Sequence, residues 1–475
     1  MKQELNYKEL GFKSGMEIHQ QLDGKKLFCN CETVIRDDKP DYTFQRELRA
    51  VVGETGKIDT AAKYEQKRKK YHVYEAYHDT NCLIEMDEEP PKQVNKKSLE
   101  IALKIALLFN AKIVDEVQVM RKTVVDGSNV SGFQRTALIA LNGYIDTSKG
   151  RVGIPVILLE EEAAKRIKDH EDFTLWNISR LGIPLIEITT DPDIKDPLHA
   201  QEVAQKIGMI CRSVEGVKRG LGTIRQDLNV SIKGHPRVEV KGFQDIRSIP
   251  KAVENEVKRQ QEEIKSGKET HSHVRNVKKD FSSAYLRPMP GGARMYPETD
   301  LPTYKLDASN LELPELIDDI SDKLEKKHKL GKDLAKALTK AKKHTLFEEL
   351  AEKLDNIKPA FIGEVLVSLP KMLSKKHNKE IKPTKDDFKT LFKALNDGKI
   401  SKDSVETILV EAKPVKDIIK NYFLMSDKDL EIEVKTIIDS NKGLPFNAMI
   451  GKVMAKLKGK ADGKKIVEVV RKHCS

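Results

Sequence analysis

The sequence contains no segment that is suited to crossing a membrane and no secretory leader. No run of about 18 apolar residues occurs in its 475 residues. The N-terminus, MKQELNYKEL, lacks the apolar core of a signal peptide. The chain has only five cysteines, too few for a disulfide scaffold at this length. We therefore expect a cytoplasmic protein in a reducing environment, without membrane contact.

Several catalytic signatures are also absent. The closest match to a Walker A motif, Gly127–Gly132 (GSNVSG), lacks the lysine that should follow its second glycine. As a lone Gly/Ser loop it is typical of a turn, although its backbone N–H groups could also bind an anion. No nucleophile elbow and no Ser–Lys amidase signature occurs, so we expect that the chain does not cleave amides or release ammonia by itself.

The length and the charge of the chain indicate a multidomain protein with a polyanionic partner. At 475 residues, two to four domains are expected. The formal net charge of +11 suits nucleic acid, although lysine-rich surfaces also occur in proteins that bind nothing acidic.

Residues 1–305 form the first expected domain, with an α+β fold. Its strand-like runs mostly alternate between apolar and polar residues, which favours a large mixed or antiparallel sheet. Helical periodicity interrupts them at Lys97–Phe109 and Pro197–Val214. The expected strands are GMEIHQQL, YTFQRELRAVV, NCLIEMD, VQVMRKTVVD, QRTALIALNG, VILLE, PLIEITTD, TIRQDLNVSI and RVEVKGF.

The rest of the chain is expected to be helical, with an all-helical domain over 306–400 and a small helical tail over 401–475. Apolar residues recur there at helical spacing. From Gly451 to Ser475 there are eight Lys or Arg residues and two acidic residues. Such a run is usually a solvated helix face, but it is also suited to binding phosphates.

Two acidic residues occur in apolar strand-like runs, Glu160 in VILLE and Glu187 in PLIEITTD. A buried carboxylate is costly unless it is paired or binds a cation. Alternatively, each carboxylate marks a strand end that turns toward water.

Other expected strands also carry charged residues on alternate positions. Since successive side chains point to opposite faces, each set shares one face of its strand. We infer one polar sheet face that lines a cleft. The three sets are Glu17 and His19; Arg225, Asp227 and Asn229; and Glu239 and Lys241.

The candidate metal ligands are Glu17, His19, Glu160 and Glu187. Three carboxylates and one imidazole suit Mg²⁺ or Mn²⁺ better than zinc. Arg225 and Lys241 would balance negative phosphate oxygens. Carboxylate-held Mg²⁺ beside Lys and Arg is typical of phosphoryl transfer.

A second metal site is possible at the cysteines. Cys29 and Cys31 form half of a zinc knuckle, which Cys82 with His72 or His78 could complete. Two free cysteines near a strand end are an equally good interpretation.

Motifs distributed along almost the whole chain together resemble the GatB/GatE family, the kinase and transamidase subunits of tRNA-dependent amidotransferases. GSNVSGFQRT and MYPETD are more similar to the archaeal E type than to the B type. The resemblance implies a cradle domain, a helical domain and a YqeY-type tail that binds tRNA. The motifs are SGMEIHQQLDGKKLFCNC, YEAYHDTNCLIEMDEEPP, VDGSNVSGFQRTALIA, LEEEAA, ISRLGIPLIEITTDPDI, GLGTIRQDLNVSI, VEVKGFQDIRSIP, RMYPETDLP and NAMIGKVMAKLKGKADGK.

The resemblance also implies an activity. ATP would phosphorylate the γ-carboxylate of glutamate on tRNA(Gln), and ammonia from a partner amidase would then displace the phosphate to give Gln-tRNA(Gln). The partner would be a GatD-like asparaginase-type subunit, or a GatA-type amidase with GatC, in a heteromeric complex.

The family's Mg²⁺ ligands correspond to Glu17, His19, Glu160 and Glu187, with Glu161 as the neighbour that could replace Glu160. The residues expected around the nucleotide and the metals are Arg225, Asp227, Asn229, Lys241, Tyr296 and Glu298.

One departure concerns substrate choice. Members of the E type usually carry a large insert that resembles part of aspartyl-tRNA synthetase, placed before the YLRP run. Only 34 residues separate Ile249-Pro250 from Tyr285, which leaves no room for it. The alternatives are the same chemistry on Asp-tRNA(Asn), a non-catalytic tRNA-binding adaptor, and an unrelated carboxylate–amine ligase.

Overall fold

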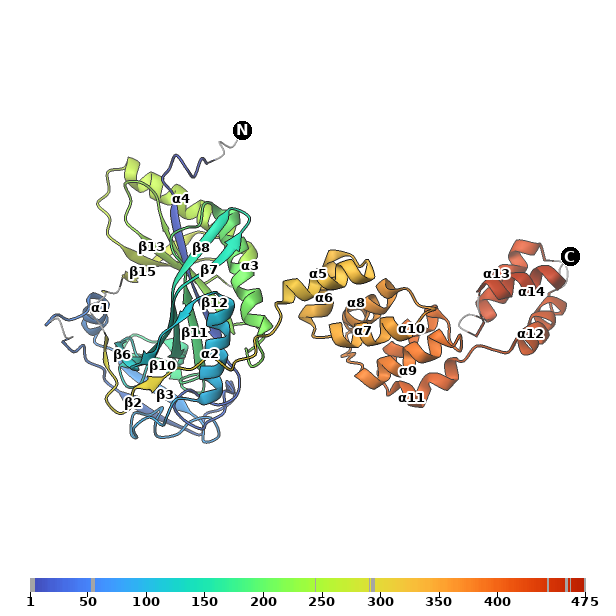
Figure 1. Cartoon of the computed structure of the whole chain (residues 1–475), viewed down its shortest axis with the longest axis horizontal. Helices are drawn as coiled ribbons and strands as arrows, with labels where there is room; N and C mark the ends of the chain where they lie inside the picture. The colour runs from blue at the N-terminus through green and yellow to red at the C-terminus, as the bar shows by residue number, and fades with distance from the viewer. Residues whose placement is uncertain are drawn as a thin grey trace. The chain divides into compact units, whose positions relative to one another are not determined.

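The computed structural model describes residues 5–52, 56–243, 245–289, 291, 295–441, 444–457, 460–461 and 463–473. The chain divides into two compact units, Met1–Pro314 and Glu315–Ser475. The first unit is a large sheet with helices, and the described part of the second is helical (Figure 1). The α+β fold class expected from the sequence is therefore confirmed.

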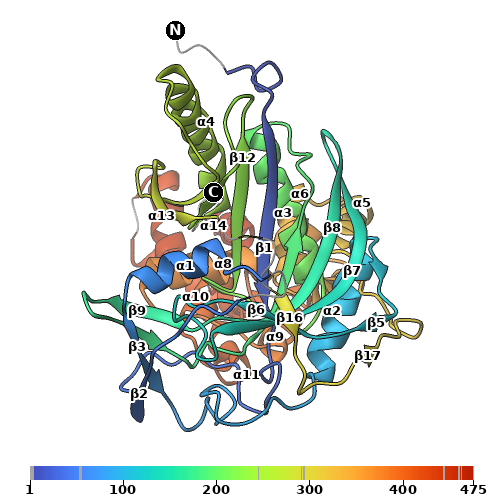
Figure 2. The ribbon, with the colours of Figure 1, turned by 90° about the vertical axis from the view of Figure 1, so that its left-hand side faces the viewer.

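The first unit is built on an 11-stranded sheet. Its strands are β1 (Lys13–Gln21), β4 (Lys112–Ile113), β6 (Met120–Thr123), β7 (Phe133–Thr147), β8 (Gly150–Glu161), β11 (Pro184–Thr189), β12 (Ile224–Ser231), β13 (Val238–Lys241), β14 (His273–Val277), β15 (Ser283–Pro288) and β16 (Met295–Pro297). Their order is β15-β14-β13-β12-β1-β11-β8-β7-β6-β16, and β4 pairs with β7. The β13–β14 pair is parallel, whereas β1 is antiparallel to both of its neighbours, β11 and β12. Figure 2 shows β1 beside β12.

One face of this sheet forms the main hydrophobic core. Ile18, Ile186 and Leu228 on it are fully buried. The helices α2 (Lys96–Leu108), α3 (Pro197–Ser213) and α4 (Ile249–Lys265) pack against β7, β1 and β12 respectively. The sequence predicted the first two of these helices to within one residue. Because apolar side chains occupy this face, the alternate positions of the same strands lie on the other face.

A smaller four-stranded sheet is also part of the first unit. Its order is β2 (Tyr42–Arg46), β3 (Tyr71–Ala76), β10 (Phe173–Asn177) and β9 (Lys165–Asp169). The remaining elements are α1 (Thr60–Lys67), the 3-10 helix η1 (Ile246–Ser248) and the pair formed by β5 (Glu116–Val117) and β17 (Tyr304–Lys305).

Two strand predictions were wrong in part or in full. YTFQRELRAVV forms a strand only as far as Arg46. NCLIEMD forms turns rather than a strand. The Glu85 carboxylate accepts a hydrogen bond from the Cys82 backbone N–H at 2.7 Å, and Asp87 has a φ of 60°. These local interactions hold the segment in a compact conformation that cannot join a ladder.

The second unit consists of short helices. They are α5 (Ile317–His328), α6 (Lys332–Lys340), α7 (His344–Lys353), α8 (Pro359–His377), α9 (Lys385–Asn396), α10 (Lys402–Val410), α11 (Val415–Ile418), the 3-10 helix η2 (Ile419–Tyr422), α12 (Asp427–Asp439), α13 (Phe446–Lys456) and α14 (Gly463–His473). The helices on both sides of residue 400 share one core, which includes Phe347, Phe392 and Ile408. The last three helices pack around a core of their own, which includes Val434, Val453 and Val470.

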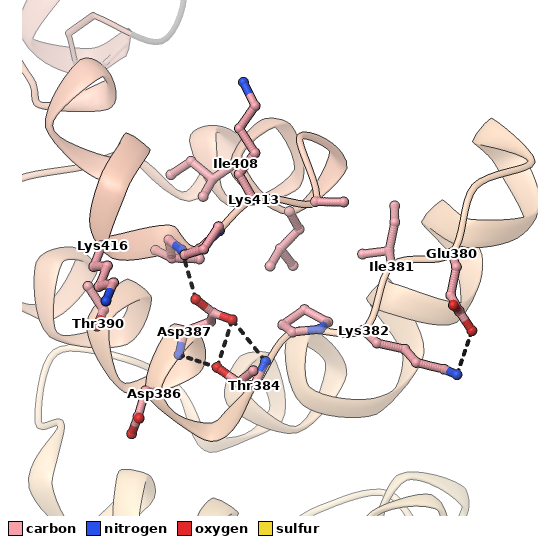
Figure 3. Close-up of a pocket in the computed structure, with 15 residues that line it drawn as sticks. Glu380, Ile381, Lys382, Thr384, Asp386, Asp387, Thr390, Ile408, Lys413 and Lys416 are labelled. Carbon is pink, nitrogen blue, oxygen red and sulfur yellow. Dashed lines mark hydrogen bonds and ion pairs between the residues drawn. The ribbon is translucent and has the colours of Figure 1, made fainter.

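A pocket of about 450 Å³ lies at the surface beside the first of these cores (Figure 3). Its wall includes the start of α9, where Thr384 and Asp387 form a capping box. Asp387 also accepts a hydrogen bond from the Val415 backbone N–H at 2.7 Å. The carboxylate thereby joins α9 to α11, and its role in this wall is structural.

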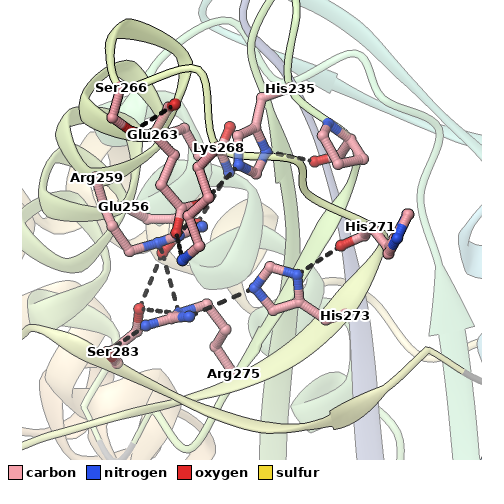
Figure 4. A network of polar contacts seen from close by, with 12 residues as sticks. His235, Glu256, Arg259, Glu263, Ser266, Lys268, His271, His273, Arg275 and Ser283 are labelled. Carbon is pink, nitrogen blue, oxygen red and sulfur yellow. Dashed lines mark hydrogen bonds and ion pairs between the residues drawn. The ribbon is translucent and has the colours of Figure 1, made fainter.

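Polar contacts fix the β14–β15 edge of the large sheet to α4 (Figure 4). The buried Glu256 accepts hydrogen bonds from Arg259 and from the Ser283 hydroxyl. Arg275 donates to Ser283, and its guanidinium lies 3.8 Å from Glu256. The short segment between Ile249 and Tyr285 is thus α4, β14 and the start of the edge strand β15, which are tied together.

None of the helices in the described part of the chain combines the length and the apolar character that a bilayer crossing requires.

Candidate functional site

The predicted polar residues lie together on the face of the large sheet opposite the helices. In the ladder, His19 on β1 is directly opposite Glu187 on β11 and Arg225 on β12. Glu17 is directly opposite Asp227, and Leu185 of β11 is opposite Glu160 of β8. Directly paired residues share a face, so register alone places these side chains on one surface. The single polar face inferred from alternation is therefore present.

His19, Glu160 and Glu187 form the first group on this surface. Each contributes a ligand atom, and these atoms lie within 4.8 Å of one another. His19 Nε2 is 3.3 Å from Glu187 Oε2. The Lys122 ammonium on β6 lies 2.5 Å from Glu160 and 3.6 Å from Glu187. Two carboxylates in a buried setting thus have a positive charge between them.

The electrostatics of this group are those of a crowded buried pair. Burial and the adjacent Glu187 raise the pKa of Glu160. Burial alone would raise the pKa of Glu187 as well, but Lys122 and His19 hold it below its usual range. Burial would lower the pKa of His19, yet the Glu187 carboxylate raises it. The site therefore favours a bound positive charge.

Glu17 belongs to a second group, together with Asp227 and Glu239. Burial raises the pKa of Glu17, and repulsion from Glu239 and Glu187 adds to this effect. The Lys241 ammonium donates to Asp227 at 2.6 Å and forms an ion pair with Glu239. The sequence predicted one shell of four ligands, but the structure has two neighbouring groups. Glu17 lies opposite Asp227 of β12, whereas His19 contacts Glu187 of β11.

Asn229 and Arg225 complete the β12 face. The Asn229 amide is 3.5 Å from Glu17 Oε1. The Arg225 guanidinium makes two contacts of 2.8 and 2.9 Å with Glu162, while about a third of its side chain stays exposed. Gln21 also donates to Glu162. Burial opposes ionisation of Glu162, but Arg225 and Arg180 lower its pKa to about 2. Arg225 is therefore held in a fixed orientation by a carboxylate that stays ionised.

Tyr296 and Glu298 are placed differently from the other candidates. The Glu298 side chain is fully buried and accepts from Arg121 at 2.6 Å and from Arg135 at 2.8 Å. Arg135 also pairs with Glu161, whereas Glu160 faces His19. The Tyr296 ring packs edge-on against Phe133. Glu298 thus pairs with Arg121 and Arg135, and an effect of Glu298 on a nucleotide would act through these arginines. Glu160, rather than Glu161, belongs to the first group.

The Gly127–Gly132 loop is a tight turn, as one interpretation of the sequence expected. Both glycines have positive φ, 88° and 77°. A Cβ atom added at Gly127 would lie 2.1 Å from the His72 ring. The loop also reaches the end of β8, because the Ala164 N–H donates to the Ser128 carbonyl. Close packing on His72 thus decides the choice of glycine there.

The donor sets fit a hard divalent cation. Carboxylate oxygens dominate both groups, with one imidazole in the first, as Mg²⁺ and Mn²⁺ prefer. The positively charged Lys122 ammonium already pairs with two of these carboxylates, Glu160 and Glu187.

Sequence reasoning missed Lys122 and Glu162. Lys122 is in the VQVMRKTVVD run, which the sequence predicted only as a strand. Only the β6–β7–β8 register shows that it faces Glu160. Glu162 directly follows β8, and its pairing with Arg225 depends on a contact across the sheet.

Comparison with known proteins agrees with this architecture. The model of the GatB/GatE catalytic domain matches residues 12–312, and the GatB domain model matches residues 345–474. The chain belongs to the GatB/GatE family. A relative from Methanocaldococcus jannaschii is 35% identical over 99% of both chains, and one from Thermococcus gammatolerans is 35% identical with the same coverage. Another, from Saccharolobus solfataricus, is 34% identical over 98% of both chains. All three are named as glutamyl-tRNA(Gln) amidotransferase subunits of the E type.

The alignments also support the absence of an insert. The match to the M. jannaschii protein extends over 625 positions and covers 99% of each chain, whereas this chain has 475 residues. The relative thus carries about 150 residues without a counterpart here, as expected for the E-type member without its insert.

Proposed function

We propose that this chain is the ATP-dependent kinase and transamidase subunit of a cytoplasmic glutamyl-tRNA(Gln) amidotransferase. The main support is the pair of acidic groups beside Lys122, Arg225 and Lys241 on one sheet face, in a chain of the GatB/GatE family. In the proposed reaction, the γ-carboxylate of the glutamyl group attacks the terminal phosphate of ATP, and ADP leaves. Ammonia then attacks the resulting acyl phosphate, and inorganic phosphate leaves.

The residues that would hold Mg²⁺ are His19, Glu160 and Glu187, with Glu17, Asp227 and Glu239 as the second group. Bound Mg²⁺ would neutralise phosphate oxygens and orient the phosphoryl group for transfer.

The chain's own cations have a separate task. Lys241 is held by Asp227 and Glu239, and Arg225 by Glu162, so both positive groups have fixed positions before a substrate arrives. Prepositioned charges stabilise developing negative charge without a reorganisation cost. Ile186 and Ile188 are fully buried on the opposite face and keep the strand that carries Glu187 in place.

The ammonia would come from a partner. The sequence has no amidase signature, and the relatives are named as subunits. The candidates are a GatD-like asparaginase-type subunit and a GatA-type amidase with GatC. Co-purification followed by mass measurement of the complex distinguishes them, since each predicts a different partner mass.

The experiment that tests the proposal measures Mg²⁺-dependent ATP turnover with Glu-tRNA(Gln), Asp-tRNA(Asn), or free glutamate. We expect turnover with Glu-tRNA(Gln) and a labelled acyl phosphate that hydroxylamine traps. A tRNA-binding adaptor predicts no turnover in any arm, and an unrelated carboxylate–amine ligase predicts turnover with free glutamate. Turnover only with Asp-tRNA(Asn) would keep the chemistry and change the substrate.

A further inference from the structure

Two arginines converge on one buried carboxylate at the edge of the proposed site. Glu162 directly follows β8, Arg225 is in β12, and Arg180 lies in the turns before β11. Arg225 contacts Glu162 at 2.8 and 2.9 Å, and Arg180 Nε lies 3.9 Å from Glu162 Oε1. Among the described residues, neither arginine forms an ion pair with another carboxylate. The three side chains together therefore carry an excess of one positive charge.

Each guanidinium has a donor left for a ligand. Arg180 donates through Nε to the Ala163 carbonyl at 2.8 Å and through Nη2 to the Ala164 carbonyl at 2.7 Å. Its Nη1 and the Nε of Arg225 have no hydrogen-bond acceptor in the part of the chain that the structure describes. The side chains of Arg180 and Arg225 are 24% and 36% exposed, whereas that of Glu162 is 2% exposed. A ligand would thus meet guanidinium donors and not the carboxylate.

The arginines lie beside the first group of the proposed cation site. Arg225 is directly opposite His19 in the ladder. Gln21, two residues further along β1, donates to Glu162 at 3.0 Å. Glu162 comes two positions after Glu160, and alternate positions of a strand share a face. An anion bound by the arginines would therefore lie next to a cation held by the first group.

The missing negative charge does not come from the described residues around the turn. Burial lowers the pKa of Arg180, so its positive charge is incompletely compensated. Glu85 lies against the same turn, 3.4 Å from the position that a Cβ atom would take at Gly182. Its carboxylate pairs instead with the buried Lys26 at 3.6 Å. It also belongs to a separate cluster, whose other members are Cys29, Cys31 and Cys82.

We propose that Arg180 and Arg225 bind the γ-carboxylate of the glutamyl group, and that their fixed positions select this side chain. The inference rests on the proposed function and assigns the reacting group of its substrate to these residues. A guanidinium offers planar N–H groups that match a carboxylate. One carboxylate also neutralises the excess of one positive charge. Its second oxygen attacks the terminal phosphate of ATP, and ADP leaves.

The other end of the polar face is better suited to the phosphates. Lys241 pairs with Asp227, which is directly opposite Glu17 on β1. Glu17 is two residues before His19, whereas Gln21 is two residues after it. Lys241 and the arginine pair thus lie toward opposite ends of this face. A carboxylate at one end and the phosphates at the other would meet at the cation between them.

Binding without ATP tests the proposal on the reconstituted wild-type complex. The ligands are tRNA(Gln) charged with glutamate and the same tRNA charged with glutamine, which has a neutral amide in place of the carboxylate. We expect the glutamyl form to bind at least about tenfold more tightly, because hydrogen bonds between charged groups are lost with the amide. The same tRNA charged with aspartate should bind like the glutamine form, since its carboxylate is one methylene short of the fixed donors.

Two wild-type results distinguish this inference from the proposed function. Equal binding of the glutamyl and glutaminyl forms, by a complex that turns over ATP with Glu-tRNA(Gln), would overturn the inference alone. A complex that shows no ATP turnover with Glu-tRNA(Gln) would contradict the proposed function, and the inference with it.

Arg180→Met should remove the preference for the glutamyl form, whereas the control Arg166→Met, at an exposed position of β9, should keep it. The KM for ATP should stay within about twofold in both variants, because the phosphates do not use Arg180. An unchanged preference in Arg180→Met, or a raised KM for ATP in its place, would show that Arg180 does not bind the carboxylate. Thermal unfolding shows whether each variant is folded. If Arg180→Met is not, Arg180→Lys keeps the charge without the planar fork and should lose part of the preference, and an unchanged preference in Arg180→Lys would overturn the proposal.

Discussion

At the scale of single residues, the site depends on how buried charges are balanced. Glu160 is 1% exposed and Glu187 has 13% of its side chain exposed, and the only lysine that an ion pair joins to both among the described residues is Lys122. Removing one partner from such a set leaves an uncompensated charge, which costs more than the intact pair contributes. Lys122 is therefore the residue whose loss should test the proposed cation site most clearly.

Lys122→Met should lower stability in EDTA by about 3–5 kcal/mol, because two adjacent carboxylates lose their counter-charge. Added Mg²⁺ should restore most of this loss. The measurement is thermal unfolding of both proteins with EDTA and with Mg²⁺. An equal Mg²⁺ effect on the variant and the wild type would show that Lys122 and the cation do not share a site.

The sequence predicted residue types better than their grouping. Alternation identified Glu17, His19, Asp227 and Glu239, because a period of two is a local property of a strand. It could not show that Glu17 turns toward β12, nor that Lys122 faces Glu160. Both facts depend on which strands are neighbours, and strand order in a mostly antiparallel sheet is not local information.

At the scale of elements, the Gly127–Gly132 loop shows how packing selects a conformation. Gly127 has positive φ and lies directly on the His72 ring, so two independent constraints exclude a side chain. The Tyr74 hydroxyl donates to the Gly127 carbonyl at 2.9 Å and fixes the loop further. The sequence predicted the turn from its composition, but its contact with β3 required the fold.

Gly127→Ala should destabilise the first unit by roughly 1–3 kcal/mol, through strain at positive φ and displacement of His72. The measurement is urea unfolding. Gly220→Ala is the matched control, since Gly220 also has positive φ but has open space around its Cα. If the two variants lose the same stability, contact with His72 contributes nothing beyond backbone strain.

His72 should make the protein sensitive to mild acid. Burial, together with Arg68, lowers the pKa of His72 below its ordinary value of about 6.5. The folded state thus favours the neutral ring, so this stability is present above pH 6.5 and is lost as the pH falls below it, by at most about 1.4 kcal/mol per pH unit. Urea unfolding of the wild type and His72→Gln at pH 7.5 and 5.5 tests this. The variant should lose less stability between the two pH values than the wild type, and an equal loss would contradict the assignment.

The prediction of a strand at NCLIEMD failed for a local reason. NCLIEMD has strand-like composition, yet side-chain contacts to its own backbone, such as Glu85 to Cys82, stabilise turns instead. The long helices α2 and α3 were predicted well because apolar residues recur along them at helical spacing. In the structure, Asn95 and Asp196 cap their N-termini.

At the scale of the whole molecule, the chain contains a sheet with a charged face and a helical unit with a lysine-rich end. Residues 451–475 carry eight Lys or Arg residues and two acidic residues. In the proposed function this end binds the tRNA body through phosphates, which gives salt-dependent affinity with little recognition of base sequence.

Reversing Lys456 and Lys460 to Glu should raise the KM for Glu-tRNA(Gln) at least about tenfold near 150 mM salt, and it should flatten the dependence of binding on salt. The KM for ATP should stay within about twofold, since no phosphate contact to ATP is assigned to these lysines. The control reverses Lys326 and Lys329, in α5 and directly after it, which changes the net charge equally. Equal effects of the two double variants would indicate a general charge effect instead of a binding surface.

The central claim is that the acidic groups of the sheet hold the cation for ATP-dependent amidation. Glu187→Gln in the reconstituted complex tests it most directly, with the exposed Glu171→Gln as control and thermal unfolding to show that both proteins are folded. We predict that Glu187→Gln lowers Mg²⁺- and ATP-dependent formation of Gln-tRNA(Gln) by about 100-fold or more, while Glu171→Gln stays near the wild-type rate. Amidation by Glu187→Gln at a near wild-type rate would contradict the account.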